Sequence, residues 1–209
     1  MKVSGVMMVR DEEKRIASSI ANLQLYVDDV FILDGGSTDK TVAIAKDMGA
    51  RVKVWDQGER NGEYGSDGKG ADWNEKERRE LMLDEARYNK VLVLDADELI
   101  AAPKDFFRYN DCSMALPRYN LATLQHAIPG IGNGWWPDFC VRFIKKGTRY
   151  SSGQIHIGPI VDDCLFMNMP IFHYKRIREK VDTTKGLMPI SMHSHPKGWE
   201  EQCPWLQGE

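Results

Sequence analysis

This sequence lacks the features that mark a membrane-spanning, secreted or zinc-binding protein. No apolar run reaches the roughly 18 residues that a transmembrane helix needs. Residues Met1–Gly5 lead directly into a strand-like run and lack the layout of a signal peptide. There is no CxxC pair and no histidine at zinc-ligand spacing from the cysteines, which are Cys112, Cys140, Cys164 and Cys203. Such spacing is typical of reduced, mostly buried thiols. We therefore expect a soluble cytoplasmic protein.

Other absences narrow the class further. A net charge of −3 provides no overall attraction to nucleic acid or anionic membranes. The glycines of segment 56–71 do not have the spacing of a Walker or dinucleotide-binding motif, so the segment is either a lid over a ligand or a plain flexible connection. With 209 residues and no internal repeat, a single domain is expected over residues 1–182, followed by a tail or lid at 183–209.

The first half of the chain alternates between strand-like and helix-like patterns. Strands are predicted at residues 3–9, 30–33, 52–55 and 91–94, with a helix in each interval between them. The last of these helices should cover about 74–87. Asp11 is placed to cap the first helix and Ser37 or Thr38 the second, which should end at Gly49. This alternation predicts an α/β fold with a mostly parallel sheet and helices on both faces.

The pattern changes after Pro103. Short extended runs at 112–117, 139–144, 153–160 and 171–174 are separated by Gly, Pro, Asn and aromatic residues. These runs favour a smaller antiparallel or mixed extension along one edge of the first half.

Three carboxylates directly follow the apolar run at 91–94, as Asp95, Asp97 and Glu98. If the extended backbone continues, Asp95 and Asp97 face the same way, because side chains alternate along a strand. Such close like charges need a compensating cation, and Mg²⁺ or Mn²⁺ suits oxygen ligands. The alternative is a strand followed by a solvated acidic turn. Position favours the cation, because Asp34 and Asp95 both end strands, where ligands of parallel sheets bind.

Three motifs in order give the chain a resemblance to a known family. Val9–Glu13, Phe31–Thr41 and Leu94–Glu98 together resemble the family-two glycosyltransferases, and the likeness resumes near Trp135–Phe143, Gln154–His156 and His173–Tyr174. The resemblance implies the GT-A fold, a Rossmann-like mixed sheet with an acceptor-side extension. It also implies transfer of a sugar from a nucleotide donor with inversion. Residues 1–100 would then bind the nucleotide-sugar, and residues 101–182 would form the acceptor side.

The resemblance also implies a set of site residues. Asp97 would hold Mn²⁺ or Mg²⁺, with Asp95 on the ribose or the metal, and His156 or His173 as a further ligand. For either histidine a structural role is the alternative. Nucleotide-contact positions implied by the resemblance are Val9, Asp11, Glu13, Asp34, Gly35, Arg79, Asp95 and Ala96. For Arg79 the two interpretations are a contact to the diphosphate and a solvated charge on a helix.

The acceptor side offers fewer firm assignments. An inverting transfer needs a general base. Asp138 is the first choice, with Glu98 and Asp162 or Asp163 as competitors. Trp135 and Trp136 can stack on a sugar or a base, one of them exposed and one in the core, and Arg142 joins them as an acceptor contact. The basic residues at 145–149 and 175–180 are either a solvated face or a site for an anionic acceptor.

The chain departs from the family at three positions, each of which bears on specificity. Asp11 stands where many members have Asn. Gly35 stands where many have a second Asp that reads uracil, and Ile157 replaces a Glu after His156.

Other functions stay open at this point. An Asp-x-Asp after an apolar run is also typical of phosphohydrolases that use an aspartyl nucleophile. A nucleotide-sugar-binding module that has lost its catalytic activity would keep the same motifs. The donor expected from the resemblance is a UDP-sugar. The acceptor is either a bacterial surface glycan or, as in a phage-type enzyme, a modified base in DNA.

Overall fold

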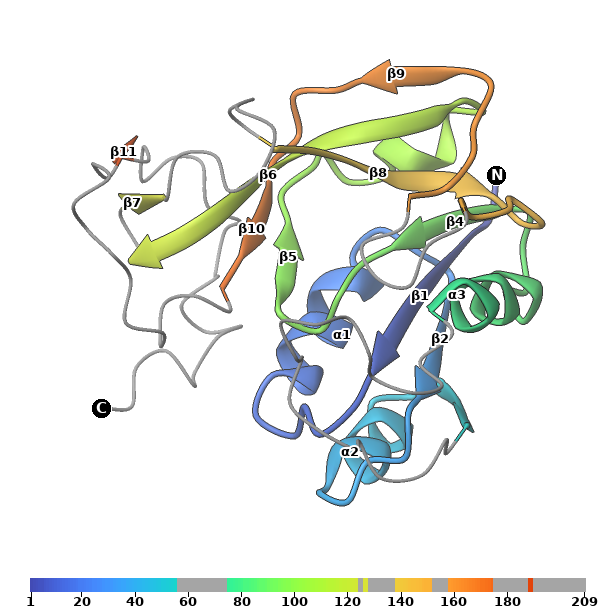
Figure 1. Ribbon diagram of the computed structural model, residues 1–209, viewed down its shortest axis with the longest axis vertical. Coiled ribbons are helices and arrows are strands. Elements are labelled where there is room, and N and C mark those ends of the chain that lie inside the picture. Colours follow the sequence, from blue (N-terminus) through green and yellow to red (C-terminus); the bar gives the residue numbers. More distant parts are fainter. Residues whose placement is uncertain (56–74, 124–125, 128–137, 152–157, 175–187, 190–209) are drawn as a thin grey trace.

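The fold is a curved mixed sheet with helices on both sides of its parallel part (Figure 1). The computed structural model describes residues 1–55, 75–123, 126–127, 138–151, 158–174 and 188–189. The strand order along the sheet is β11-β7-β6-β8-β4-β1-β2-β3, with β9 and β10 both paired to β6 and β5 paired to β10. The expected α/β class is confirmed.

The first half supplies the parallel strands. Its elements are β1 (Val3–Val9), α1 (Ile16–Gln24), β2 (Asp29–Asp34), α2 (Thr41–Asp47), β3 (Arg51–Val54), α3 (Glu75–Asp84) and β4 (Lys90–Val93). β1 pairs in parallel with both β2 and β4, and β2 pairs in parallel with β3. Val9 lies opposite Asp34, so β1 and β2 end level with each other. The strands predicted in this half are all present.

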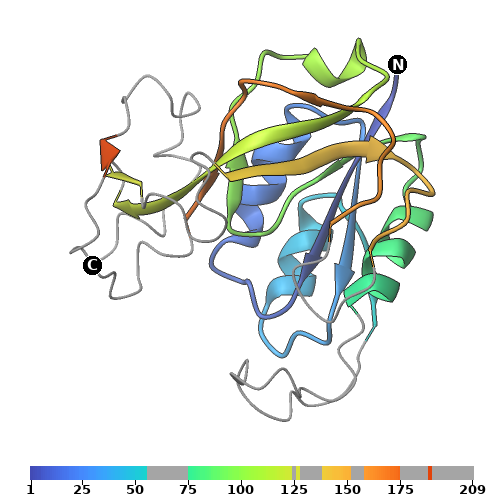
Figure 2. The same ribbon diagram turned by 45° about the horizontal axis from the view of Figure 1, so that its top comes forward.

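Alternation along the strands produces two apolar layers. Met7 and Ile32 pack with Ile20 of α1 in one cluster, whereas Val6 and Leu33 pack with α3 in the other. Figures 1 and 2 accordingly show α1 and α2 on one side of the parallel strands and α3 on the other. Both faces are covered, which explains why these strands are apolar almost throughout.

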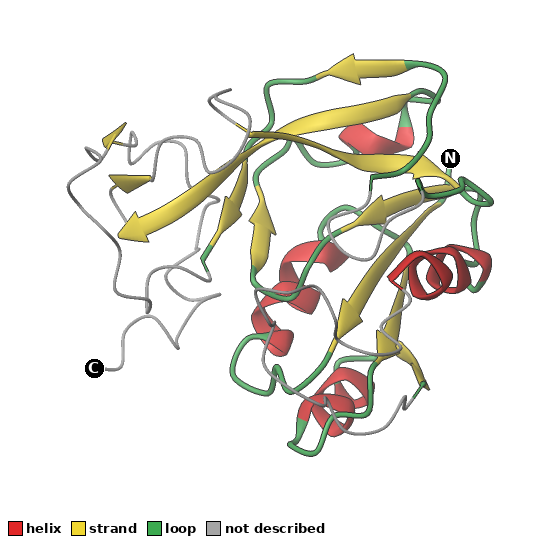
Figure 3. Cartoon of the chain, in the orientation of Figure 1, coloured by secondary structure: helices red, strands yellow, loops and turns green. Residues whose placement is uncertain are grey.

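The described residues of the second half form strands joined by loops, apart from the short helix η1 (Phe106–Arg108) (Figure 3). Its strands are β5 (Glu98–Ile100), β6 (Ser113–Thr123), β7 (His126–Ala127), β8 (Asp138–Lys145), β9 (Cys164–Phe166), β10 (Ile171–His173) and β11 (Met188–Pro189). β8 pairs antiparallel with β4 on one side and with β6 on the other. This confirms the mixed extension, although β5, β7, β9 and β11 were not predicted as strands. Most of the run predicted at 153–160 lies outside the described residues.

Two predicted helix caps are wrong. α1 begins at Ile16, because Asp11 has a positive φ of 53° and its Oδ1 accepts the Thr38 N–H at 2.7 Å. α2 begins at Thr41, and it is Asp39 whose Oδ1 accepts the Thr41 N–H at 2.9 Å. The predicted stop at Gly49 is confirmed by its φ of 80°, a conformation that glycine adopts at low cost. Both errors have one cause, namely that the polar side chains bind a neighbouring loop.

The expectation that the β4 strand runs on through Asp97 is also wrong. β4 ends at Val93, and the Glu98 N–H donates to the Asp95 carbonyl at 3.1 Å, which closes a turn. Asp95 and Asp97 therefore do not share one face of a strand. Asp97 is instead fixed through its backbone, because its carbonyl accepts the Tyr174 N–H at 2.9 Å.

Two further expectations can be compared with the described residues. No helix among them is long and apolar enough to cross a membrane. Cys112, Cys140 and Cys164 form no disulfide and are half-buried rather than mostly buried. Cys203 lies outside the described residues.

Candidate functional site

The carboxyl ends of β1, β2 and β4 bring together the first two sequence motifs and the acidic turn. Asp34 ends β2, and its carboxylate is fully buried. Its Oδ1 accepts the N–H groups of Gly36 at 3.0 Å and Ser37 at 2.9 Å, and its Oδ2 accepts the Ser37 hydroxyl. Asp34 therefore shapes the loop that follows β2.

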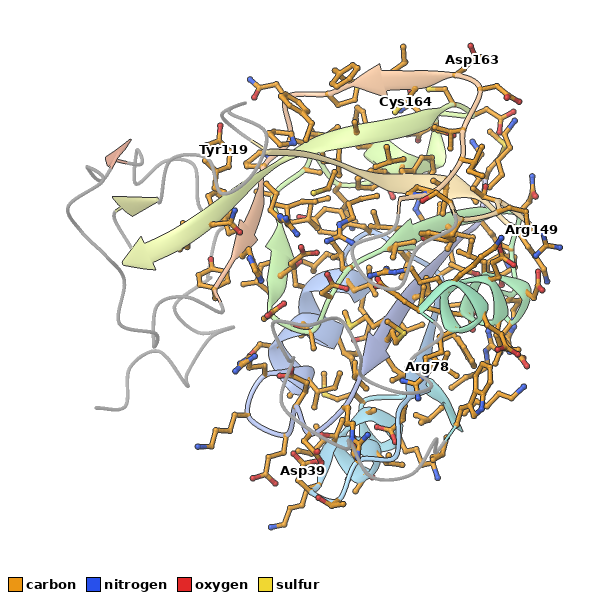
Figure 4. The ribbon with its side chains drawn as sticks, viewed as in Figure 1. Asp39, Arg78, Tyr119, Arg149, Asp163 and Cys164 are labelled. Carbon is orange, nitrogen blue, oxygen red and sulfur yellow. The ribbon has the colours of Figure 1, made fainter. Side chains whose placement is uncertain are left out.

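Two loops at this edge are bound to each other. The Asp11 N–H donates to Ser37 Oγ at 2.8 Å, so Ser37 connects the β1–α1 loop to Asp34. The Glu13 N–H donates to Asp39 Oδ2 at 3.0 Å, and Glu13 Oε2 accepts the Lys40 N–H at 3.2 Å. Figure 4 places Asp39 in this region, at the end of the molecule opposite Asp163. The side chains of Asp11 and Glu13 thus bind the backbone of the β2–α2 loop and join the two loops at this edge.

Asp95 lies between two guanidinium groups. Arg142 Nη2 donates to its Oδ2 at 3.0 Å, and 32% of the Asp95 side chain is exposed. Burial alone would raise the pKa of Asp95, but the nearby charges of Arg142 and Arg79 hold this pKa well below its usual range. Asp95 is therefore an ionised acceptor of fixed orientation that still reaches solvent. The structure places Arg142, predicted as an acceptor contact, on this carboxylate instead.

Glu98 has the geometry of a structural ion pair. Its side chain is fully buried, with Oε1 2.5 Å from Arg142 Nη2 and 3.6 Å from Arg118 Nη1. Its Oε2 accepts the Asp95 N–H at 3.2 Å. Both oxygens are thus committed inside the protein, and this position does not suit the role of general base that the sequence suggested for Glu98.

Arg79 points into the protein, with its side chain 14% exposed, so the interpretation as a solvated helix charge is wrong. Its Nε donates to Glu75 Oε1 at 2.7 Å, and its guanidinium lies over the Tyr150 ring at 5.6 Å. Burial lowers the pKa of Arg79, but the charges of Asp95 and Glu75 help to raise this pKa above its ordinary value. Arg79 is therefore a buried cation that is bound to Glu75 and feels the charge of Asp95.

Asp97 and His173 come together from distant parts of the chain. His173 Nε2 lies 3.2 Å from Asp97 Oδ2, and His173 Nδ1 lies 2.6 Å from Asn120 Oδ1. Arg15 Nη1 is the next cation, 3.9 Å from Asp97. Within the described residues, no group of three His, Cys, Asp or Glu side chains is arranged to hold a metal ion. The protein therefore offers a pair of donors here.

The other predicted residues are placed as follows. Val9 accepts the Gly35 N–H at 2.8 Å, and the Ala96 carbonyl accepts the Ser19 hydroxyl. Asp138 begins β8 opposite Arg118, while Asp162 and Asp163 are exposed before β9. Several predictions lie outside the described residues: segment 56–71, Trp135, Trp136, His156, the basic residues at 175–180, and the tail apart from β11.

Sequence analysis missed two residues near this edge. Arg78 is buried, and a Cβ on Gly35 would lie 3.1 Å from Arg78 Nη1, so a larger residue at position 35 would displace this guanidinium. Asn120 is buried beside His173. Neither belongs to a local motif. The only sequence signal for Arg78 was its position directly before Arg79 on the same predicted helix.

Comparison with known proteins identifies the family of the first half. Residues 4–104, just under half of the chain, match the family model described as Glycosyl transferase family 2. An uncharacterised glycosyltransferase of Rickettsia felis is 43% identical over 53 residues, which are 25% of this chain and 19% of that protein. A TPR repeat-containing protein of Synechococcus elongatus is 34% identical over 97 residues, 46% of this chain and 21% of that protein. The aligned part thus spans about a fifth of these curated relatives.

A solved structure supports the fold over a longer stretch. The crystal structure of S. aureus TarS superimposes with a TM-score of 0.52 at 13% identity, covering 83% of this chain and 36% of that one. At this identity the likeness concerns the fold alone. The family match thus covers residues 4–104, and the structural likeness supports a GT-A-type fold over the longer stretch.

Proposed function

We propose that this member of glycosyl transferase family 2 transfers a sugar from a nucleotide-sugar donor to a hydroxyl acceptor, with inversion and with the help of a divalent cation. The observation that carries the proposal is the convergence of Asp97 Oδ2 and His173 Nε2 beside Asp95, at the carboxyl edge of the sheet. Ligands of such sheets bind at this edge. The family match of residues 4–104 supports the same chemistry.

The donor pair suits Mn²⁺ or Mg²⁺. Asp97 offers a carboxylate oxygen and His173 a ring nitrogen, both on side chains that are largely buried. Such ions are commonly held by one or two protein groups, with phosphate oxygens and water completing the shell. When bound, the cation would neutralise charge on the leaving nucleotide diphosphate.

The remaining residues would orient the donor. Asp95 is ionised and partly exposed, so it can accept a hydrogen bond from a ribose hydroxyl, and Arg142 holds it in place. Arg79 can direct its guanidinium to the diphosphate, a fit between forked donors and phosphate oxygens. Asp138 stays our candidate for the general base, because Glu98 is engaged with Arg142 and is fully buried.

The substrates follow from the family resemblance alone. We expect a UDP-sugar donor and a glycan acceptor. A DNA acceptor would need an uncompensated basic surface, and Arg149, one of the residues suggested for it, lies 3.7 Å from Glu80 and 3.8 Å from Asp84. This compensation favours a glycan over DNA.

The test measures how fast the donor loses its nucleoside diphosphate, by hydrolysis or by transfer of the sugar. A panel of nucleotide sugars is incubated with the protein with and without Mn²⁺, and release of the nucleoside diphosphate is measured. We expect release only with Mn²⁺, and its loss in Asp97→Asn, whose thermal unfolding should stay unchanged. The matched control is Asp163→Asn, an exposed carboxylate far from the site. Full turnover by Asp97→Asn would refute the proposal.

A further inference from the structure

Asn120 is a buried polar residue that no motif of the chain assigns to a task. It lies on β6, 53 residues before His173, and the two residues face each other in the parallel β6–β10 pair. The Asn120 side chain is 5% exposed, and its Oδ1 lies 2.6 Å from His173 Nδ1. A buried amide needs hydrogen-bond partners, because an unsatisfied amide inside a protein costs free energy of folding.

The direction of this hydrogen bond fixes the chemistry of the imidazole. An amide oxygen can only accept, so His173 Nδ1 carries the proton and donates it to Asn120. In the neutral ring the lone pair is then on Nε2, the atom that lies 3.2 Å from Asp97 Oδ2. A lone pair and a carboxylate that face each other repel, unless a cation or a second proton lies between them.

We infer that Asn120 is a positioning residue that keeps His173 in the tautomer that presents Nε2 as a metal donor beside Asp97. This inference rests on the proposed function and names a residue that makes the site work. Histidines that bind metals ordinarily donate their second N–H to such an acceptor. Here the hydrogen-bond acceptor is Asn120 on β6, and His173 is on the neighbouring strand β10. The pairing of these two strands therefore completes a site whose carboxylate, Asp97, comes from the first half.

The opposite arrangement makes a clear contrast. If the amide nitrogen of Asn120 faced Nδ1, then Nε2 would carry the proton and bond directly to Asp97, and His173 would have a structural role. Asn120→Asp separates the two arrangements, because an ionised carboxylate can accept a hydrogen bond from Nδ1–H but cannot donate a hydrogen bond to Nδ1. Asn120→Leu removes the acceptor while nearly keeping the volume.

The experiment measures Mn²⁺ binding directly, by the EPR signal of the free ion, in the 209-residue chain with and without UDP. We expect Asn120→Leu to weaken Mn²⁺ binding about 10- to 100-fold, as loss of such an orienting partner does in other metal sites. Asn120→Asp should bind Mn²⁺ at least as tightly as the wild type. Tyr119→Phe is the control, because it changes the neighbouring residue, which stacks on Phe172, and should leave Mn²⁺ binding unchanged.

A second readout does not depend on activity or on manganese. With Mg²⁺ and UDP present, ¹⁵N spectra of His173 should show Nδ1 protonated in the wild type and in Asn120→Asp, and a mixture of tautomers in Asn120→Leu. A protonated Nε2 in the wild type, or unchanged Mn²⁺ affinity in a folded Asn120→Leu, would overturn the inference. His173→Gln distinguishes a failure of the inference about Asn120 from a failure of the proposed metal site. If this variant binds Mn²⁺ as the wild type does, the proposed metal site itself is wrong.

Discussion

Arg142 and Asp95, 47 residues apart in the sequence, are joined by a hydrogen bond of 3.0 Å from Nη2 to Oδ2. The same nitrogen lies 2.5 Å from the fully buried Glu98. One guanidinium from β8 therefore compensates two of the three carboxylates that follow β4. This leaves Asp97 as the carboxylate of the turn that faces His173 instead of Arg142.

The Arg142–Glu98 pair should be important for stability. Arg142→Met leaves Glu98 buried without its closest positive partner, and we expect the free energy of unfolding to fall by about 3–5 kcal/mol. Adding Glu98→Gln should recover part of this loss, because the uncompensated charge is then removed. Urea unfolding of both single variants and the double variant measures the coupling. Strictly additive losses would show that the pair is not coupled.

Arg79 should act on turnover more than on folding. The charge of Asp95 acts on Arg79, which we propose to contact the diphosphate, and removing one such positive donor from a phosphate site lowers kcat by about 100-fold or more. Arg79→Met should therefore lose activity while keeping most of its thermal stability. Lys76→Met, on the same helix, is the control and should behave as the wild type. Equal activities of the two variants would assign Arg79 a purely structural role.

Gly5 is required by the close contact of β1 with α1. A Cβ at this position would lie 2.6 Å from the side chain of Leu23, closer than packed atoms approach. Gly5→Ala should lower the free energy of unfolding by about 1–3 kcal/mol through overpacking. Gly158→Ala is the matched control, because nothing lies within 4 Å of the added atom. Thermal unfolding of the two variants decides, and an equally stable Gly5→Ala would contradict this packing.

Asp29 should make stability depend on pH at the end of the sheet away from the site. Burial raises the pKa of Asp29, but two hydrogen bonds from Arg51, at 3.0 and 2.8 Å, lower it below its usual value. A carboxyl whose pKa is lower in the folded state stabilises the protein above the unfolded pKa of about 3.9. That stabilisation is lost as the pH falls through the folded pKa.

Asp29→Asn should thus cost about 1–2 kcal/mol at pH 7, and the difference from the wild type should shrink below about pH 4. Chemical unfolding at a series of pH values measures both quantities. Asp163→Asn, at an exposed position, is the control, and its stability at pH 7 should match that of the wild type. A difference that grows toward acid pH would mean that the sign of the pKa shift is wrong.

The sequence alone determined the α/β class, and it predicted a site at one edge of the sheet. The apolar runs at 3–9 and 91–94 are buried on both faces, so local composition was sufficient to identify them as strands of a covered parallel sheet. The sequence also predicted that Asp34 and Asp95 lie at the ends of strands, and in the structure Asp34 ends β2 while Asp95 lies in the turn that follows β4. These features depend on residues that are neighbours in the sequence, which is why they could be read from it.

Only the tertiary structure decided what each polar side chain binds. Asp11 resembles a helix cap in the sequence but binds Thr38, and Glu98 resembles a general base but is paired with Arg142. The Asn120–His173 contact exists because β6 and β10 lie side by side, and no local pattern encodes it. Hydrogen bonds and ion pairs act over a few ångströms, so their partners are set by how distant strands pair rather than by spacing along the chain.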